Sequence, residues 1–353
     1  MKPKVSVIIL SWNAEHLLRK FLPQAAEHCT LRGERDNVEI VIADNGSTDG
    51  TEEFVKELAA GLPSDYLQFL PLERNWGFAE GYNRALKEIE AEYVVLLNDD
   101  VEVTPHWLDP LVEYMDAHSD VAACQPKLLS WKEKGKFEYA GACGGYVDKY
   151  GYPFCRGRIF NTVETDSNQY LTTSELLWAT GACLFIRKEE FQNAGGLDGR
   201  FFAHMEEIDL CWRLRCRMKK IACVTESTVF HVGGASLAAG NPRKTFLNFR
   251  NNLLMLYKNL PEEELRSVMR MRSLLDAAAA FAFLLKGEGK NFIAVFRARK
   301  AFRQLKTEFS QSREENLMAA RKAGNPMMHV PERRPIFLLW HYHIKKKRTF
   351  SQL

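Results

Sequence analysis

Short apolar runs rich in β-branched residues alternate with helical patterns through the first hundred residues, and this alternation is what most restricts the fold. The apolar runs span residues 5–10, 38–43 and 93–97, and the helical patterns between them span residues 14–28, 51–60 and 79–90. Near-continuous apolar strands connected by helices are typical of a parallel sheet that is covered on both faces. The sequence therefore predicts an α/β domain with a mainly parallel central sheet.

A group of polar side chains follows each of the three apolar runs. These side chains belong to Ser11, Asn13, Asp44, Asn98, Asp99 and Asp100. In open α/β sheets, ligands bind beyond the carboxyl ends of the strands, at the point where the strand order reverses. We therefore expect these side chains to meet at one edge of the sheet and to form a ligand site there.

The adjacent carboxylates of Asp99 and Asp100 indicate a bound divalent cation. Two ionised aspartates at the end of an apolar strand repel each other unless water or a cation screens them. Mg2+ and Mn2+ bind through one or two protein carboxylates and share their other positions with substrate phosphates. The pair therefore predicts Mg2+ or Mn2+ and a phosphorylated ligand. The alternative is a solvated turn before a helix that Thr104 caps and Pro105 begins.

Residues 44–50 also suit an anionic ligand. The amides of this turn and of the helix that follows favour negative groups, and Asp44 can accept hydrogen bonds from a base or a ribose. The segment is equally compatible with a simple helix cap at Ser47 or Thr48. The two interpretations do not exclude each other.

The alternation of strands and helices breaks down after residue 120. Glycine-rich and aromatic segments follow, and we interpret this half as the part that shapes an acceptor pocket. Three acids, Glu206, Glu207 and Asp209, then begin a helix, where ordinary capping is one interpretation because the helix dipole favours acids in a first turn. Apolar neighbours at residues 201, 202 and 205 would raise the pKa of a carboxylate toward that of a general base, and we favour this catalytic interpretation.

A single histidine, His231, ends the last apolar run of this part of the chain. A lone histidine after apolar residues is usually structural. Beside carboxylates that hold a metal, however, a neutral imidazole is a suitable further ligand. We therefore include His231 in the predicted metal site.

Charge divides the chain into an acidic body and a basic C-terminal region. Residues 241–353 contain 23 Lys+Arg against 9 Asp+Glu, a formal charge of +14, so residues 1–240 carry −11 of the total of +3. We therefore expect a catalytic domain at residues 1–240 and a basic helical region at residues 241–353. The eight cysteines form no CxxC pair and indicate a reducing compartment, and the start of the chain lacks a secretory pattern, so a cytoplasmic location is predicted.

The basic region combines helical patterns with apolar and cationic side chains. The patterns span residues 265–285 and 291–309, and an apolar run at residues 336–340 precedes four cations at residues 345–348. Basic amphipathic helices commonly lie at a membrane interface, where anionic headgroups attract their cations. We therefore expect peripheral association with the inner face of the cell membrane, with packing on the catalytic domain or on a second subunit of a homo-oligomer as the alternative. No recognised motif for nucleic acid accompanies the charge, so no nucleic-acid partner is predicted.

Taken in order, these segments resemble the family 2 glycosyltransferases of the GT-A fold, especially bacterial rhamnosyltransferase-like and galactofuranosyltransferase-like members. The resemblance covers residues 4–258 and implies a nucleotide-diphospho-sugar transferase fold with a C-terminal helical extension. It also implies that one group of residues binds the donor substrate, with Asp44 toward the base. This group consists of Ser11, Asn13, Asp44, Asn75, Gly77, Gly81, Asn83, Asn98 and Asp99.

The resemblance also implies the chemistry. The metal-binding Asp-x-Asp motif of the family falls on Asn98-Asp99-Asp100, so Asp100 and His231 would hold the metal. The Glu-Asp base motif falls on Glu206-Glu207, where Glu207 replaces the usual aspartate, and Glu206 and Asp209 are the alternative bases. Trp178 would stack on the acceptor or donor sugar, or else belong to the core.

The implied function is inverting, metal-dependent transfer of a sugar from a UDP- or dTDP-sugar to a glycan or lipid-linked acceptor in cell-surface polysaccharide synthesis. Two other classes of protein stay open. A sugar nucleotidylyltransferase would carry a glycine-rich basic loop after the first strand, where this chain has Ser11-Trp12-Asn13. A non-catalytic protein that binds sugar nucleotides would show no turnover.

Overall fold

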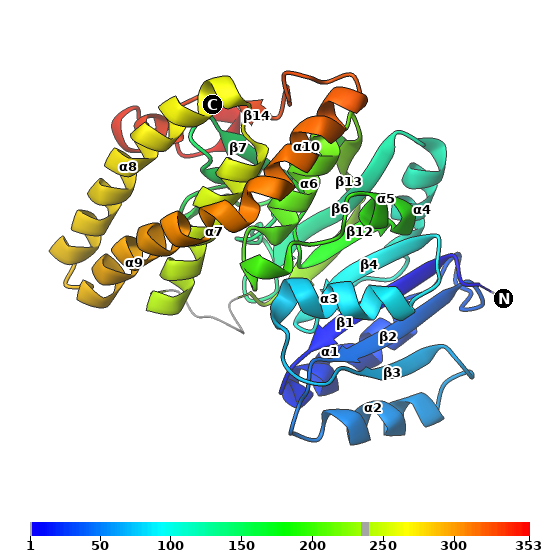
Figure 1. Ribbon diagram of the computed structural model, residues 1–353. Helices are drawn as coiled ribbons and strands as arrows, with labels where there is room; N and C mark the ends of the chain where they lie inside the picture. The colour runs from blue at the N-terminus through cyan, green and yellow to red at the C-terminus, as the bar shows by residue number, and fades with distance from the viewer. Residues whose placement is uncertain (1, 234–239) are drawn as a thin grey trace.

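The computed structural model describes residues 2–233 and 240–353, and it combines an α/β body with a group of C-terminal helices (Figure 1). Within these residues the main sheet has nine strands in the order β11-β13-β6-β12-β4-β1-β2-β3, and β5 pairs with β13 outside this path. The strands are β1 (Val5–Ser11), β2 (Val38–Asp44), β3 (Leu67–Pro71), β4 (Tyr93–Asn98), β5 (Val101–Val103), β6 (Val121–Ser130), β11 (Ser174–Glu175), β12 (Cys183–Arg187) and β13 (Lys220–His231).

The sheet is mixed, with a parallel half formed by the strands that the sequence predicted. β4, β1, β2 and β3 run parallel to one another, as do β6 and β13. β12 lies antiparallel to both β4 and β6 and so joins the two parallel groups into one sheet. The prediction of a mainly parallel sheet is confirmed for the N-terminal half, where strands and helices alternate.

Helices cover both faces of this sheet. The helices of the body are α1 (Glu15–His28), α2 (Thr51–Ala60), α3 (Gly77–Glu88), α4 (Leu108–Ala117), α5 (Lys188–Asn193) and α6 (Glu206–Cys216). Buried side chains of α1, α2 and α4 pack with Val5, Val7 and Ile9, whereas those of α3, α5 and α6 belong to the same core as Ile8. Because successive strand residues point to opposite faces, a strand that is apolar at every position is buried on both sides.

A second sheet contains the glycine-rich and aromatic half of the chain. Within the described residues it has the order β10-β9-β8-β7-β14. Its strands are β7 (Gly145–Asp148), β8 (Pro153–Cys155), β9 (Arg158–Ile159), β10 (Thr162–Val163) and β14 (Arg333–Arg334). Tyr146 and Phe154 are buried here, so these aromatic side chains fill a core. β14 comes from the C-terminal region and pairs with β7, which ties the last part of the chain to the body.

Four long helices follow the body and pack together. They are α7 (Pro242–Asn259), α8 (Glu262–Leu285), α9 (Gly289–Leu305) and α10 (Ser310–Lys322), and α8 and α9 form a hairpin that projects from the body (Figure 1). Short helical turns lie at Gly199–Phe201, Lys306–Phe309, Trp340–Ile344 and Phe350–Gln352. One hydrophobic cluster contains α6, α7 and the C-terminal residues Phe309 and Leu338, so residues on both sides of the predicted 240/241 boundary share a core.

The two helix caps considered as alternative interpretations are not formed. The side chains of Ser47 and Thr48 do not cap α2, whose N-cap residue is Gly50; the Ser47 hydroxyl instead accepts a hydrogen bond from the Asn13 amide at 2.8 Å. Thr104 does not cap α4, which begins at Leu108; its hydroxyl donates to the Thr228 carbonyl. In both cases a contact with a distant segment replaces the local bond. Across the described ranges 2–233 and 240–353, every helix is too short or too polar to cross a membrane.

Candidate active site

The three polar clusters of the sequence meet at one edge of the main sheet. In the register of the parallel strands, Ser11 is paired with Asp44, and Leu10 is paired with Asn98. The carboxyl ends of β1, β2 and β4 are therefore adjacent, as predicted. This is the position where ligands bind in open α/β sheets.

A histidine reaches the same edge through the antiparallel pairing of β13 with β5. This pairing sets His231 opposite Val101, the residue that follows Asp100. His231 Nε2 lies 3.0 Å from Asp100 Oδ1 and 3.4 Å from Asn98 Nδ2. The backbone amide of Gly233 also donates to Asp100 Oδ2 at 3.2 Å. The predicted metal ligands are thus in direct contact. The residues that follow in the sequence, Gly234, Ala235 and Ser236, lie outside the described residues.

A fourth charged group, Glu138, lies on the other side of the imidazole. Glu138 Oε1 is 3.3 Å from His231 Nδ1, and both side chains are buried. A carboxylate that faces the second ring nitrogen of a metal-binding histidine fixes the orientation of the ring. The sequence does not predict this role, because Glu138 follows no strand-end pattern and reaches His231 only through the fold.

The electrostatics of this cluster separate the two aspartates. Burial, together with the charge of Asp100, raises the pKa of Asp99 to about 7. Burial would also raise the pKa of Asp100, but the hydrogen bond and the charge of His231 outweigh it and lower that pKa. Burial would lower the pKa of His231, but its contacts with Asp100 and Glu138 raise it to about 10. Without a bound cation, a proton on His231 therefore offsets the charge of Asp100, while Asp99 lacks an equal partner; a metal ion held by His231 would replace that proton.

The side chains at this edge suit a divalent cation. A diphosphate of the ligand would supply the coordination positions that the protein leaves open. Among residues 2–233 and 240–353, no group of three or more His, Cys, Asp or Glu side chains is arranged to hold a metal ion. Asp100 and His231 supply one carboxylate and one imidazole, and Asp99 is adjacent. Mg2+ and Mn2+ sites that bind a nucleotide commonly use one or two carboxylates and leave the other positions to phosphate and water.

The helix that carries the predicted base begins after a strained loop. α6 begins at Glu206, and Phe202, His204 and Met205 before it have positive φ angles of 67°, 72° and 74°. Non-glycine residues rarely adopt this conformation, and it is found where the surrounding structure holds the backbone. Asn251 of α7 does so here, because its Nδ2 atom donates to the carbonyls of three loop residues. These are Phe201, Ala203 and His204, at 3.0, 2.8 and 2.8 Å.

Glu206 and Glu207 both carry a buried oxygen, Oε2, with no hydrogen-bond partner in the described part of the chain. Glu206 is buried, whereas Glu207 is half-buried. Burial, together with the charge of Glu207, raises the pKa of Glu206 well above its usual range. Burial raises the pKa of Glu207 to about 7. A carboxylate with a pKa near neutrality and partial exposure has the properties of a general base.

Asp209 has a different environment. It is fully buried, and its Oδ2 atom accepts hydrogen bonds from Arg213 Nε at 2.9 Å and from Lys258 Nζ at 2.8 Å. Its Oδ1 atom accepts from Asn259 Nδ2 at 2.8 Å. Both oxygens are thus occupied by groups that join α6 to α7, which favours a structural role for Asp209 over its predicted role as a base.

Glu207 lies beside the end of β4 through the segment that precedes β12. A β-carbon at Gly181 would lie 3.7 Å from Glu207 Cβ. The next residue, Ala182, accepts a hydrogen bond from the Asn98 amide at 3.0 Å. The base candidate and the acidic strand end are therefore separated by one short backbone segment.

The residues predicted to bind the nucleotide lie at the same edge of the sheet. Ser11 and Asp44 are buried, and the Asp44 Oδ1 atom is buried without a hydrogen-bond partner in the described residues, while Oδ2 accepts from the Ser47 amide. Asn13 has a φ of 49°, and its Oδ1 atom accepts from the Thr48 amide at 2.8 Å. An unpaired buried carboxylate oxygen at a strand end is a free acceptor for a ligand donor group.

The segment before α3 is held by contacts that include Asn45, a residue the sequence analysis missed. Asn45 Nδ2 donates to Asn75 Oδ1 and to the Gly77 carbonyl, at 3.3 and 3.2 Å. Gly77 has a φ of +77°, and a β-carbon there would collide with the ring of Phe202. At Gly81, a β-carbon would lie only 2.9 Å from the Leu10 side chain, so this glycine allows α3 to approach β1.

The side chains of Asn83 and Trp178 form hydrogen bonds with the backbone of neighbouring segments. Asn83 Nδ2 donates to the Leu197 carbonyl at 2.7 Å, and its Oδ1 atom accepts from the Leu197 amide at 3.0 Å. The indole of Trp178 is buried, and its Nε1 atom donates to the Tyr146 carbonyl at 3.0 Å. A buried indole with a satisfied N–H cannot stack on a sugar, so the core alternative holds for Trp178. Asn83 joins α3 to the loop before α6 through its two bonds to Leu197.

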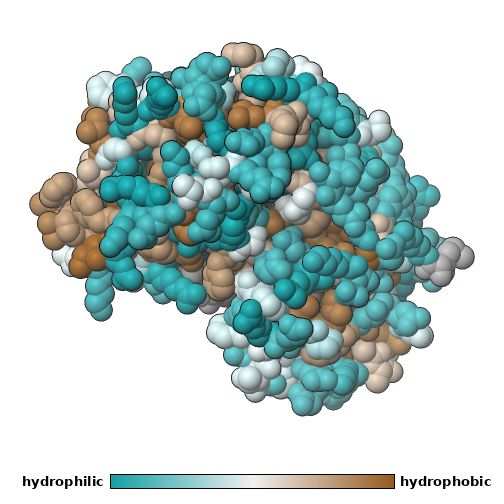
Figure 2. All heavy atoms as spheres, viewed as in Figure 1, coloured by the Kyte–Doolittle hydropathy of each residue, from teal (hydrophilic) through white to brown (hydrophobic). Residues whose placement is uncertain are grey.

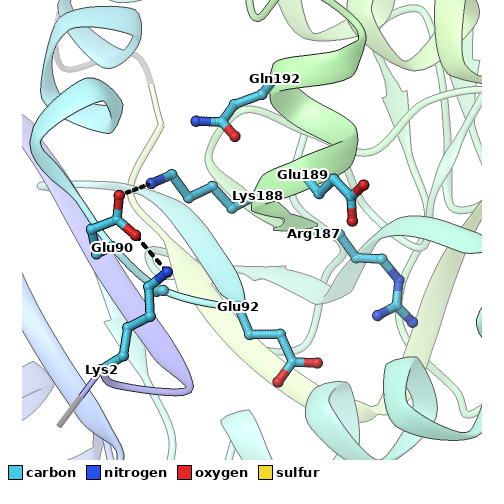
Figure 3. Close-up of a pocket in the computed structure, with 8 residues that line it drawn as sticks. Lys2, Glu90, Glu92, Arg187, Lys188, Glu189 and Gln192 are labelled. Carbon is cyan, nitrogen blue, oxygen red and sulfur yellow. Dashed lines mark hydrogen bonds and ion pairs between the residues drawn. The ribbon is translucent and has the colours of Figure 1, made fainter.

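A hollow of about 360 Å³ lies at the opposite end of the strands (Figure 3). Lys2 and Lys188 both point toward Glu90, with Nζ to carboxylate distances of 2.5 and 3.5 Å. Lys2 precedes β1 and Glu92 precedes β4, whereas the polar clusters follow these strands. This hollow is therefore separate from the candidate active site.

Solved structures of similar architecture define the fold. The chain is similar to GalNAc-T7 with UDP, GalNAc and Mn2+, with a TM-score of 0.57 and 15% identity over 74% of this chain and 49% of that one. It is also similar to S. aureus TarS 1-349 in complex with UDP-GlcNAc, with a TM-score of 0.54 and 17% identity over 92% of this chain and 90% of that one. The fold is the GT-A fold of glycosyltransferases, with C-terminal helices added.

The family follows from the sequence comparison. The family model described as "Glycosyl transferase family 2" matches residues 6–189, and the chain belongs to this family. The chain therefore contains a glycosyltransferase domain of family 2. The alternatives of a sugar nucleotidylyltransferase and of a non-catalytic binding protein receive no support from these comparisons.

Two curated relatives come from bacteria. The O-antigen biosynthesis protein RfbC of Myxococcus xanthus is 28% identical over 243 residues, which are 67% of this chain and only 18% of RfbC. The N-acetylglucosaminyl-diphospho-decaprenol L-rhamnosyltransferase of Mycobacterium tuberculosis is 26% identical over 230 residues, 61% of this chain and 71% of that enzyme. The chain therefore spans a small part of RfbC and most of the rhamnosyltransferase.

Proposed function

We propose that this glycosyltransferase moves a sugar from a nucleoside diphosphate sugar to an acceptor hydroxyl in one displacement, with inversion at the anomeric carbon. The observation that carries the proposal is the pairing of two unlike acidic sites at one edge of the sheet. Asp99 and Asp100 with His231 suit a metal and a diphosphate, and Glu207 nearby has a pKa of about 7. Together they supply a place for the leaving group and a base for the acceptor.

We infer that Asp100 and His231 hold Mg2+ or Mn2+. The 3.0 Å contact between the two side chains supports this inference, and so does the carboxylate that Asp100 contributes. Two structural neighbours are described with Mn2+. When bound, the cation would stabilise the negative charge that develops on the leaving diphosphate. Asp99, which lacks an equal partner, would lie beside the same group.

Glu207 is the proposed general base. Its unpaired Oε2 atom accepts the proton of the acceptor hydroxyl, and the oxygen of that hydroxyl attacks the anomeric carbon as the diphosphate leaves. The new glycosidic bond forms on the face opposite the broken bond, so the configuration inverts. Glu206 is more deeply buried, and the adjacent charge of Glu207 disfavours its ionisation, so it remains the alternative base.

Ser11, Asn13 and Asp44 are proposed to bind the nucleotide, with UDP or dTDP as the nucleotide of the donor. The free Oδ1 atom of Asp44 supports this role, since it can accept a hydrogen bond from a pyrimidine base. We propose a glycan or lipid-linked acceptor, because one relative is described as acting on a diphospho-decaprenol compound. Such an acceptor would place the enzyme at the inner face of the cell membrane.

The proposal is tested by hydrolysis and transfer assays with a panel of UDP- and dTDP-sugars in Mg2+ or Mn2+. We expect Glu207→Gln to lower turnover at least about 100-fold, the range for loss of a general base. Asp100→Ala should also abolish turnover. Glu207→Gln should unfold at the wild-type temperature, whereas Asp100→Ala should unfold at a lower temperature because it removes a partner of the buried His231. Circular dichroism should show that both variants are folded at the assay temperature, and Glu314→Gln on the exposed face of α10 is the matched control.

Two outcomes would redirect the assignment. Wild-type turnover in Glu207→Gln together with loss in Glu206→Gln would move the base to Glu206. Equal activity with and without a metal chelator would remove the metal from the mechanism.

A further inference from the structure

The free end of the α8–α9 hairpin is an apolar surface. Phe281, Leu284 and Leu285 of α8 are 56%, 47% and 89% exposed, and Ile293 and Phe296 of α9 are 54% and 45% exposed. Figure 2 shows apolar side chains at this projecting end of the molecule. Contiguous exposed apolar side chains on a folded protein mark an interaction surface.

The charges around this surface are mainly positive. α9 carries five cations, Lys290, Arg297, Arg299, Lys300 and Arg303, and no acidic residue. Asp276, the acid nearest in α8, is fully buried and forms ion pairs with Arg272 and Arg299. Glu288 in the turn accepts a hydrogen bond from the Asn291 side chain. The occupant that complements such a surface is anionic.

A groove of about 400 Å³ lies beside the apolar end, between α7 and α9. Three cations and four apolar side chains line it: Arg243, Lys290, Arg297, Pro242, Phe246, Ile293 and Ala294. The arrangement of guanidinium and ammonium groups over apolar walls suits a phosphate group that is attached to a hydrocarbon.

One residue that lines the groove contacts the loop before the helix of the proposed base. The Arg243 guanidinium lies 5.2 Å from the ring centroid of Phe202, which belongs to the strained loop before α6. The Phe202 carbonyl accepts hydrogen bonds from the amides of Phe78 and Ala79 at the start of α3. A ligand that contacts Arg243 in the groove would thus be separated by one side chain from the loop that positions Glu207.

We propose that the hairpin end docks on an anionic phospholipid bilayer and that the groove binds a lipid phosphate there. This inference names the surface through which the protein would associate with a membrane. It rests on the proposed function only for the idea that the acceptor is carried by a lipid. Apolar side chains enter the interface while the cations meet the headgroups. A second copy of the chain is the less suitable occupant, because two such ends would bring the cations of both α9 helices together.

The test is co-sedimentation of the full chain with vesicles, without any donor sugar. We expect binding to phosphatidylcholine vesicles that contain phosphatidylglycerol, weaker binding at high salt, and little binding to phosphatidylcholine alone. The double variant Lys290→Glu, Arg297→Glu should weaken partitioning about 30-fold or more, since each cation near an anionic surface contributes roughly a fivefold factor. Phe281→Ser with Leu285→Ser should weaken it at least about tenfold.

Matched controls come from exposed residues elsewhere. Leu171→Ser and Met218→Ser remove side chains of similar exposure away from the hairpin, and Lys322→Glu reverses a charge on α10; all three should bind as wild type. Glu207→Gln should also bind as wild type, which separates this proposal from the proposed chemistry. Equal partitioning of the hairpin variants and the wild type would overturn the proposal. A dimer that Leu285→Ser dissociates would overturn it in favour of a second copy.

Discussion

At the scale of single residues, the site works through differences between neighbouring acids. Asp99 and Asp100 are adjacent in sequence, yet the contact of Asp100 with His231 lowers its pKa while burial raises that of Asp99. Glu206 and Glu207 differ in the same way, because only Glu207 is partly exposed. Unlike environments for like groups are how a protein assigns separate roles to them.

Activity should depend on pH through Glu207. Burial raises the pKa of Glu207 to about 7, and a base must be ionised to act, so kcat/KM should fall about tenfold per pH unit below that value and level off above it. Asp99 also has a pKa of about 7, so the Asp99→Asn variant serves as the control. We expect its residual activity to keep the same midpoint. A wild-type profile that stays flat down to about pH 5, near the ordinary pKa of glutamate, would contradict this prediction.

Glu138 should control metal affinity through His231. Glu138→Gln keeps the shape of the side chain but removes the charge that faces His231 Nδ1 at 3.3 Å. Loss of such a partner typically weakens metal binding about 10- to 100-fold. We expect the dissociation constant of Mn2+ to rise within this range, as measured from the electron paramagnetic resonance signal of the free ion. Glu102→Gln is the control, because Glu102 lies on β5 but its carboxylate accepts hydrogen bonds from Trp131 and Lys134 and forms no ion pair with His231. Equal weakening in both variants would contradict a specific role for Glu138.

The scale of helices and strands explains which parts of the site the sequence predicts. The apolar runs give β1, β2 and β4 nearly to the residue, and the position of polar residues after them predicts that Ser11, Asp44 and Asn98 meet. Glu138, Asn45 and Asn251 are missed, since each acts through contacts with segments remote in sequence. Periodicity reports burial along one element, but not which distant element lies against it.

Asn251 should set the geometry of the base helix. Asn251→Ala removes the donor from three carbonyls of the strained loop before α6. Buried acceptors left without a donor cost about 1–3 kcal/mol, so the free energy of unfolding should fall by that amount. Because the loop also positions Glu207, we expect kcat to fall and the pH midpoint to move toward that of an ordinary glutamate.

Asn316→Ala is the control for this effect. Asn316 is buried in α10 and donates to Asn259 Oδ1 at 3.5 Å, so its loss should reduce stability without moving the pH midpoint. If Asn251→Ala changes only stability and leaves the pH midpoint at the wild-type value, the role of Asn251 is structural alone.

At the scale of the whole molecule, the charge pattern and the packing divide the chain differently. The formal charge changes sign near residue 240, which is the basis for the predicted domains 1–240 and 241–353. The hydrophobic core does not divide there, because Leu253, Phe309 and Leu338 belong to the same cluster as Trp212 of α6. Charge reports the surface that a region presents, whereas a folding unit is defined by shared buried area.

Removal of residues 260–353 should therefore disrupt the body. The truncated chain would lose β14 from the second sheet, the Glu332 partner of Arg215 at 2.6 Å, and Phe350 packed on Tyr146. We expect little soluble protein and a lowered unfolding temperature, measured by fractionation and by thermal unfolding. The hairpin variant Phe281→Ser, Leu285→Ser should unfold close to the wild-type temperature, because both side chains are exposed. A soluble truncated chain that unfolds like the full chain would instead show that the basic region is an independent unit joined to a self-sufficient catalytic domain.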